Sequence, residues 1–226
     1  MRLPVTRHDN YAFLLAGLLF FFLLIPILHS LVDAGINVGL MRSLAQAGVS
    51  AMMLIGVWSL IREKQLFRIE LGLAGLSVAF PVFGMFYPSL GVDIGQSVVA
   101  LIFCVISGFI AARHVFSGAR VNRNRLYGAM CVYLLMGLAW AIVYTFIFNF
   151  FPASFHGMEA PGNPVVFDDF LYFSFVTLAS LGYGDISPAG PLARTFAYLE
   201  VIAGQFYIAI MVAGLVGLYM KKREGE

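Results

Sequence analysis

Residues 126–150 form a long apolar run without a charged side chain. A membrane-spanning helix needs about 20 predominantly apolar residues, so this run is long enough to cross a bilayer. The whole chain is 61% hydrophobic and only 12% charged, whereas soluble domains average roughly 25% charged residues. The sequence therefore excludes an ordinary soluble domain and predicts an all-α protein with several membrane spans.

Five further apolar runs predict spans. They cover residues 11–28, 43–61, 69–87, 92–112 and 191–220. The first run follows Arg2 and Arg7, a pattern that also fits a signal peptide. No small-residue cleavage site follows Ile27, so we interpret this run as a span. Between the runs, residues 29–42 predict a loop, and residues 151–166, with three prolines, predict an exposed turret.

Residues 167–179 are apolar but too short to cross the membrane. They predict a helix that enters the membrane and returns, between the fifth and sixth spans. A short polar stretch follows this helix, up to Asp185. Non-helical backbone at membrane depth is tolerated only where it is buried in protein or lines a wet path. The fold class is thus an all-α membrane protein with six spans and a re-entrant helix.

The polar stretch reads Ser180-Leu181-Gly182-Tyr183-Gly184-Asp185. It resembles the selectivity filter of potassium channels, Thr-Val-Gly-Tyr-Gly-Asp, with two substitutions at the first two positions. The resemblance covers roughly residues 126–220. It implies that rings of backbone carbonyls replace the hydration shell of K⁺. The K⁺ sites would lie at Ser180, Leu181, Gly182 and Tyr183, with Gly184 completing the filter.

The resemblance also assigns the outer mouth. Asp185 ends the filter, and in the family this carboxylate often accepts a hydrogen bond from an aromatic residue of the pore helix. Tyr172 is at that position here. The alternative is a solvated carboxylate. Asp168 and Asp169 either cap the pore helix or concentrate cations at the mouth, and both roles are compatible.

The sixth span carries three features of interest. Exposing the Glu200 carboxyl group to lipid would cost too much free energy. We therefore expect it to form a hydrogen bond to the pore-helix region rather than an ion site. Gly204 is at the family's hinge position, although glycine also permits simple close packing. Gln205 aligns with a cavity-facing position, and Ile208 and Val212 follow on the same face. The alternative for Gln205 is an interhelical hydrogen bond.

The chain divides into two predicted domains. Residues 1–120 form a peripheral domain of four spans, and residues 121–226 form the pore domain. A voltage sensor requires a ladder of basic residues in its fourth span. The only charged residue in the predicted fourth span, residues 92–112, is Asp93, which lies at one edge. We therefore expect a peripheral domain that does not sense voltage.

Basic residues predict the orientation. With a cytoplasmic N-terminus, the cytoplasmic side receives every basic residue except Arg42 and Arg194. Both termini would then be cytoplasmic, and the filter would open to the outside of a plasma or inner membrane. A filter of four identical segments requires a homotetramer surrounded by lipid. We expect no nucleic-acid partner and, with six residues after Met220, no attached soluble regulatory domain.

The predicted function is passive, potassium-selective conduction that is not strongly voltage-gated. Alternatives are a weakly selective monovalent cation channel, because Ser180 and Leu181 depart from the usual filter, and a potassium-uptake transporter subunit. Such transporters usually carry four degenerate filters in one chain, and this sequence has one well-formed filter. A non-conducting scaffold would not require these glycines. No enzyme constellation is present, since the four histidines are scattered without ligand spacing.

Overall fold

The computed structural model describes residues 11–33, 38–59, 64–87, 89–116, 123–158 and 166–223. Seven α-helices make up nearly all of this part. They are α1 (Tyr11–Asp33), α2 (Val38–Ser59), α3 (Lys64–Phe86), α4 (Leu90–Phe116), α5 (Arg123–Phe150), α6 (Val166–Leu178) and α7 (Pro191–Arg223). The remaining elements are a short 3₁₀ turn, η1 (Pro152–Ser154), and two strands of two residues, β1 (Phe155–His156) and β2 (Ser187–Pro188).

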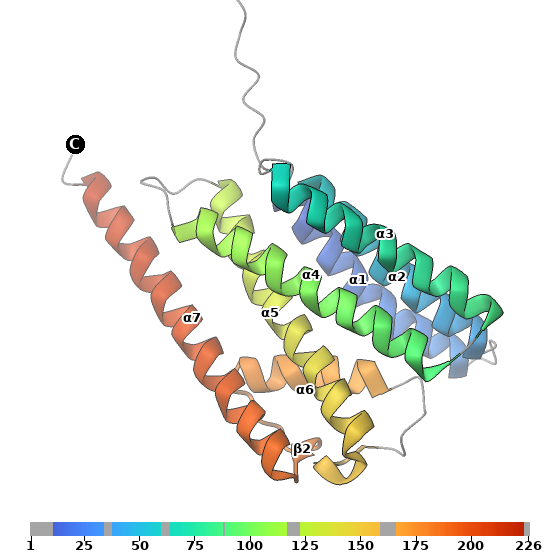
Figure 1. Cartoon of the computed structure of the whole chain (residues 1–226). Coiled ribbons are helices and arrows are strands. Elements are labelled where there is room, and N and C mark those ends of the chain that lie inside the picture. Colours follow the sequence, from blue (N-terminus) through green and yellow to red (C-terminus); the bar gives the residue numbers. More distant parts are fainter. Residues whose placement is uncertain are drawn as a thin grey trace, which may run out of the picture.

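Helices α1 to α4 lie side by side as a bundle, and α5 packs along α1 and α4 (Figure 1). The short helix α6 crosses between α5 and α7, near the end of the molecule where β2 is found. Helix α7 lies on the far side of α5 from the bundle (Figure 1). The pore helix is thus held between the peripheral bundle, the outer helix α5 and the inner helix α7.

Within the described residues, five helices are long and apolar enough to cross a membrane: α1, α3, α4, α5 and α7. The chain is therefore a multi-pass membrane protein. The remaining predicted span, over residues 43–61, corresponds to α2. This helix is 22 residues long, but its apolar stretch, Ser43–Trp58, is shorter than the others.

The predicted loop over residues 29–42 is wrong for most of its length. Helix α1 continues through Pro26 to Asp33, and α2 already begins at Val38. Single polar residues among apolar ones do not end a helix, because a helix can direct them to one side. What lies between the two helices, residues 34–37, is outside the described residues.

The turret is only partly as predicted. Ser154 and Phe155 are buried rather than exposed, and β1 pairs antiparallel with β2 just beyond the filter. The carbonyl of Ser154 accepts hydrogen bonds from the amides of Ala189 and Gly190, at 2.8 and 3.1 Å. These bonds explain the burial, because they join the turret to the filter's exit. Residues 159–165 of the predicted turret lie outside the described residues.

An aromatic cluster attaches α6 to α5. The ring of Phe155 lies 4.8 Å from that of Phe170, and the ring of Tyr144 lies 5.0 Å from that of Phe173. Both pairs are in the edge-to-face arrangement that aromatic rings prefer. Tyr144 and Phe170 are fully buried. The packing fixes the height and direction of the pore helix before the filter begins.

Candidate functional site: the filter and its supports

The pore helix ends at Leu178, and the backbone then adopts an unusual pattern. Ser180, Gly182 and Gly184 all have positive φ, at 58°, 61° and 82°, whereas Leu181 and Tyr183 between them do not. In an extended strand, successive residues face opposite sides. Changing the sign of φ at every second residue instead turns successive carbonyls toward one side. Glycine reaches these angles without a steric penalty, which explains two of the three residues.

Backbone amides of the filter are hydrogen-bonded to the pore helix. The amide of Ser180 donates to the carbonyl of Thr177 at 2.9 Å. The amides of Leu181 and Gly182 donate to the carbonyl of Val176, at 2.8 and 3.4 Å. Among the described residues, no backbone amide donates to a carbonyl of residues 180–184. The donors are therefore used within the chain, and the carbonyl oxygens remain available for a cation.

Side chains at the outer mouth connect the filter to α6. The ring of Tyr172 stacks on that of Tyr183 at 6.5 Å, with an interplanar angle of 19°. The hydroxyl of Tyr172 donates a hydrogen bond to Asp185. This bond lowers the pKa of the Asp185 carboxyl below its ordinary value of 3.8, because it favours the charged form. Asp185 and Tyr172 are thus in contact, and their role at an outer mouth stays a prediction.

The inner helix contacts the filter through Gln205. Its Nε2 donates a hydrogen bond to the Ser180 hydroxyl at 2.9 Å. One helical turn further, Ile208 is exposed in the single chain, and Val212 is exposed one turn beyond it. This bond joins α7 to the filter and not to another helix, so it is not the interhelical hydrogen bond given above as the alternative. The exposure of Gln205, together with that of Ile208 and Val212, leaves the cavity-facing interpretation open as a proposal.

Glu200 is completely buried between three helices. Tyr144 of α5 donates a hydrogen bond to its Oε2 at 2.5 Å. The Ser174 hydroxyl of α6 lies 2.5 Å from Oε1 and 2.8 Å from the carbonyl oxygen of Gly137. The contact with Ser174 is a hydrogen bond to the pore helix, of the kind expected from the sequence. Glu200 thus connects the inner helix to both the outer helix and the pore helix.

The single hydroxyl proton of Ser174 constrains the protonation state of the Glu200 carboxyl group. A hydroxyl carries one proton and accepts others, so Ser174 can donate to Gly137 or to Glu200, but not fully to both. When Ser174 donates to the Gly137 carbonyl, a protonated Glu200 donates to Ser174 and every contact is satisfied. A neutral acid also removes the high cost of a buried charge. The geometry therefore favours a neutral Glu200.

Gly204 lies against the end of the pore helix. A Cβ atom at this position would come within 2.4 Å of the Leu178 carbonyl oxygen and 2.9 Å of its Cδ1. A glycine is therefore needed for the close approach of α7 to α6. The hinge role implied by the resemblance stays a prediction.

Three supporting residues escaped sequence reasoning. Tyr144 and Ser174, the partners of Glu200, lie 56 and 26 residues from it along the chain. The third is Gly157, which has a φ of 79° and whose Cβ would meet the Asp185 carbonyl oxygen at 2.0 Å. The only sequence signals for these residues are a tyrosine and a serine inside apolar helices and a glycine shortly after Pro152.

Comparison with known families identifies this arrangement. Residues 132–221 match the family model described as "Ion channel". This segment is similar to an ion-channel pore domain. It covers most of α5 and α7 together with α6 and the filter, so the contacts described above for Glu200, Gly204 and Gln205 lie inside it. The match is to a family of ion channels.

The pore domain is similar to curated potassium channels. It is 34% identical over 93 residues to "Two pore potassium channel c" of Oryza sativa subsp. japonica, covering 41% of this chain and 19% of that protein. It is 34% identical over 95 residues to "Two-pore potassium channel 5" of Arabidopsis thaliana, covering 42% and 21%. "Inward rectifier potassium channel Kirbac3.1" of Paramagnetospirillum magnetotacticum is 34% identical over 63 residues, covering 28% and 21%.

The chain spans about a fifth of the length of these curated relatives. No solved structure matches it significantly. The family model covers residues 132–221 and does not reach helices α1 to α4.

Proposed function

We propose that this protein is a potassium-selective channel that conducts K⁺ passively through a filter formed by four copies of residues 180–184. The observation that carries the proposal is the alternating sign of φ at Ser180, Gly182 and Gly184. Together with amides bonded to the pore helix, it leaves a row of carbonyl oxygens available to replace the hydration shell of the ion. The similarity to curated potassium channels supports the same ion.

The K⁺ ions would be held by the carbonyls of Ser180, Leu181, Gly182 and Tyr183. The hydroxyl of Ser180 would provide the innermost oxygen. It accepts a hydrogen bond from Gln205, and a hydroxyl has two acceptor lone pairs. One lone pair therefore remains for an ion, as a threonine at this position would provide.

A homotetramer is the assembly that fits this site. The described part of the chain has one filter, and a ring of carbonyls needs several copies. Leu181 and Tyr183 are 57% and 67% exposed in the single chain, and so are many apolar residues of α7, such as Phe206 at 66%. Neighbouring subunits would cover the filter side chains, and lipid or subunits would cover α7.

The proposed topology has six spans, with α2 as the second. Its 22 residues suffice to cross a bilayer core, and it packs against α1 and α3. Both termini would be cytoplasmic and the filter would face outward in a plasma or inner membrane, because basic residues concentrate on the opposite side.

A reversal potential tests the proposal. Purified protein is placed in liposomes with K⁺ on one side and Na⁺ on the other. A potential near the K⁺ equilibrium value is expected. A clear current that reverses near zero would contradict selectivity and favour the weakly selective channel, with Ser180 and Leu181 as the cause. Flux that requires a coupled ion would favour a transporter, and no flux at all would contradict conduction.

A further inference from the structure

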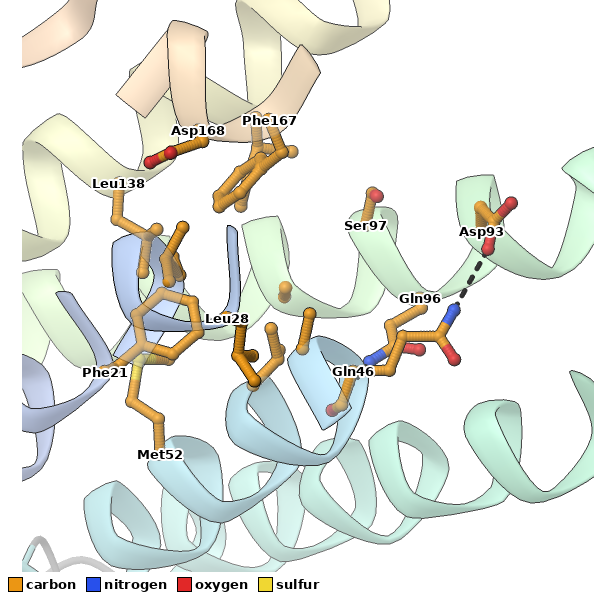
Figure 2. Close-up of a pocket in the computed structure, with 15 residues that line it drawn as sticks. Phe21, Leu28, Gln46, Met52, Asp93, Gln96, Ser97, Leu138, Phe167 and Asp168 are labelled. Carbon is orange, nitrogen blue, oxygen red and sulfur yellow. Dashed lines mark hydrogen bonds between the residues drawn. The ribbon is translucent and has the colours of Figure 1, made fainter. Parts of the chain in front are cut away.

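A cavity of about 190 Å³ lies where the peripheral bundle meets the pore helix. Its walls come from α1, α2, α4, α5 and the first turn of α6 (Figure 2). Most of the lining is apolar, and it includes Phe21, Met52, Leu138 and Phe167. The cavity therefore lies between the two predicted domains. One of its lining residues, Phe167, belongs to the pore helix.

One end of the cavity is polar, and its amide donors are already used. Gln46 Nε2 donates to Asp93 Oδ1 at 3.0 Å, the bond drawn in Figure 2. Gln96 Nε2 donates to the Gln46 carbonyl at 3.2 Å. The other amide atom of Gln96, Oε1, has no hydrogen-bond partner among the described residues. Gln96 is only 4% exposed, so bulk water does not satisfy this oxygen.

A buried acceptor without a partner is unfavourable, since it has lost its water and gained no replacement. In native proteins such groups call for an explanation, and a bound donor, whether water or a ligand, is one. Two carboxylates, Asp93 and Asp168, also line the cavity, but both have partners already. The remaining walls are mostly apolar and would penalise a charged donor, which points to a neutral molecule with one hydroxyl.

We propose that this cavity binds a small neutral amphiphile, an aromatic or short-chain alcohol, whose hydroxyl donates to Gln96 Oε1 and whose apolar part packs against Phe21, Met52 and Phe167. The size is adequate, because an apolar protein cavity of about 150 Å³ accommodates benzene. Nothing in the pore mechanism uses this site.

The position of the site links it to the channel. An occupant touches α1, α2 and α4 on one side and Phe167 of α6 on the other. It would therefore change how firmly the start of the pore helix is held, and a ligand shifts an equilibrium when it binds two states differently. This second step rests on the proposed conduction, whereas binding itself does not. The peripheral domain would thus serve as a sensor of membrane-soluble alcohols.

Binding is tested on the full-length protein in detergent micelles, with phenol and toluene as the probes. Both fit the cavity, but only phenol has a hydroxyl. We expect phenol to raise the unfolding temperature more than toluene does. In Gln96→Leu, which keeps the size but removes the acceptor, the affinity for phenol should fall about tenfold, as expected for one hydrogen bond to a buried group, while toluene is unaffected.

A second variant, Ala45→Phe, fills the cavity from α2 and should abolish both effects. Ala45 lines the cavity but is not fully buried, so folding is expected to survive. Direct detection by fluorine NMR of a fluorophenol replaces the thermal assay for any variant that unfolds early. Equal binding to the wild type and to Ala45→Phe would overturn the site, because it would show partition into the micelle alone.

Conduction is measured separately. Phenol should change the open probability of wild-type channels and not of Ala45→Phe channels. If phenol binds without changing the open probability, the sensor role is contradicted but the binding site is not. Absence of current in wild-type channels would instead contradict the proposed function, so the two failures are distinguishable.

Discussion

Gly182 has a backbone conformation that a side chain resists. Its φ is 61°, and an L-residue with a side chain pays roughly 1–2 kcal/mol in this region. The surroundings offer no obstacle, since a Cβ here would meet nothing within 4 Å. We therefore expect Gly182→Ala to abolish potassium current while tetramers still assemble, as checked by liposome flux and size-exclusion chromatography.

The control is Gly108→Ala in α4, where a Cβ also meets nothing within 4 Å and φ is ordinary. This variant should conduct normally. Unchanged current in Gly182→Ala would contradict the filter assignment.

Glu200 leads to a prediction about hydrogen bonding rather than charge. Glu200→Gln retains an acceptor for Tyr144 and a donor for Ser174, so current and stability should change little. Glu200→Ala leaves the buried Tyr144 hydroxyl without its partner, at a cost of about 1–3 kcal/mol, and leaves Ser174 only its bond to the Gly137 carbonyl. Its unfolding temperature should fall clearly below that of Glu200→Gln. If the two variants are equally damaged, an ionised Glu200 is indicated instead.

Tyr172 leads to a pH prediction. In the folded protein the pKa of Asp185 is lowered by the hydrogen bond from Tyr172. The stabilisation is therefore present above the ordinary pKa of 3.8 and is lost as the pH falls through the lowered value. Tyr172→Phe keeps the ring stack on Tyr183 but removes the bond. Acid on the outer side should then reduce single-channel current at a higher pH than in the wild type. Identical pH profiles would show that the bond does not matter.

At the scale of elements, α7 approaches the end of α6 closely at Gly204, in addition to the hydrogen bond between Glu200 and Ser174. A Cβ at Gly204 would press on the Leu178 carbonyl oxygen, which is backbone and cannot move aside. We expect Gly204→Ala to lower the unfolding temperature of the tetramer by several degrees. A variant of unchanged stability with altered open probability would instead support the hinge role.

Several elements were predictable because their signals are local. The length of α6 and the filter motif lie within residues 167–185, and the structure places the helix at Val166–Leu178. The contacts of Glu200 were not predictable in detail, because its partners come from helices far away in the sequence. The loop between α1 and α2 was predicted too long, since polar residues inside apolar helices resemble loop residues. The cavity was invisible because five helices create it together.

At the scale of the whole molecule, the peripheral bundle lacks the charges of a voltage sensor. Helix α4 carries Asp93 in its first turn and Arg113 and His114 in its last, with no charged residue between them. Moving one charge through the membrane field is worth about 2.3 kcal/mol per 100 mV. We expect open probability to change little between roughly −100 and +100 mV. A steep, saturating conductance–voltage curve would contradict this.

The bond between Gln205 and Ser180 joins the proposed selectivity filter to α7, the helix proposed to line the inner end of the pore. Any coupling between two sites acts equally in both directions. If movement of α7 alters the innermost oxygen ring, then K⁺ seated in that ring must alter the preferred position of α7. The permeating ion would thus be a regulator of its own pathway, and the potassium concentration would be a gating stimulus without any dedicated receptor.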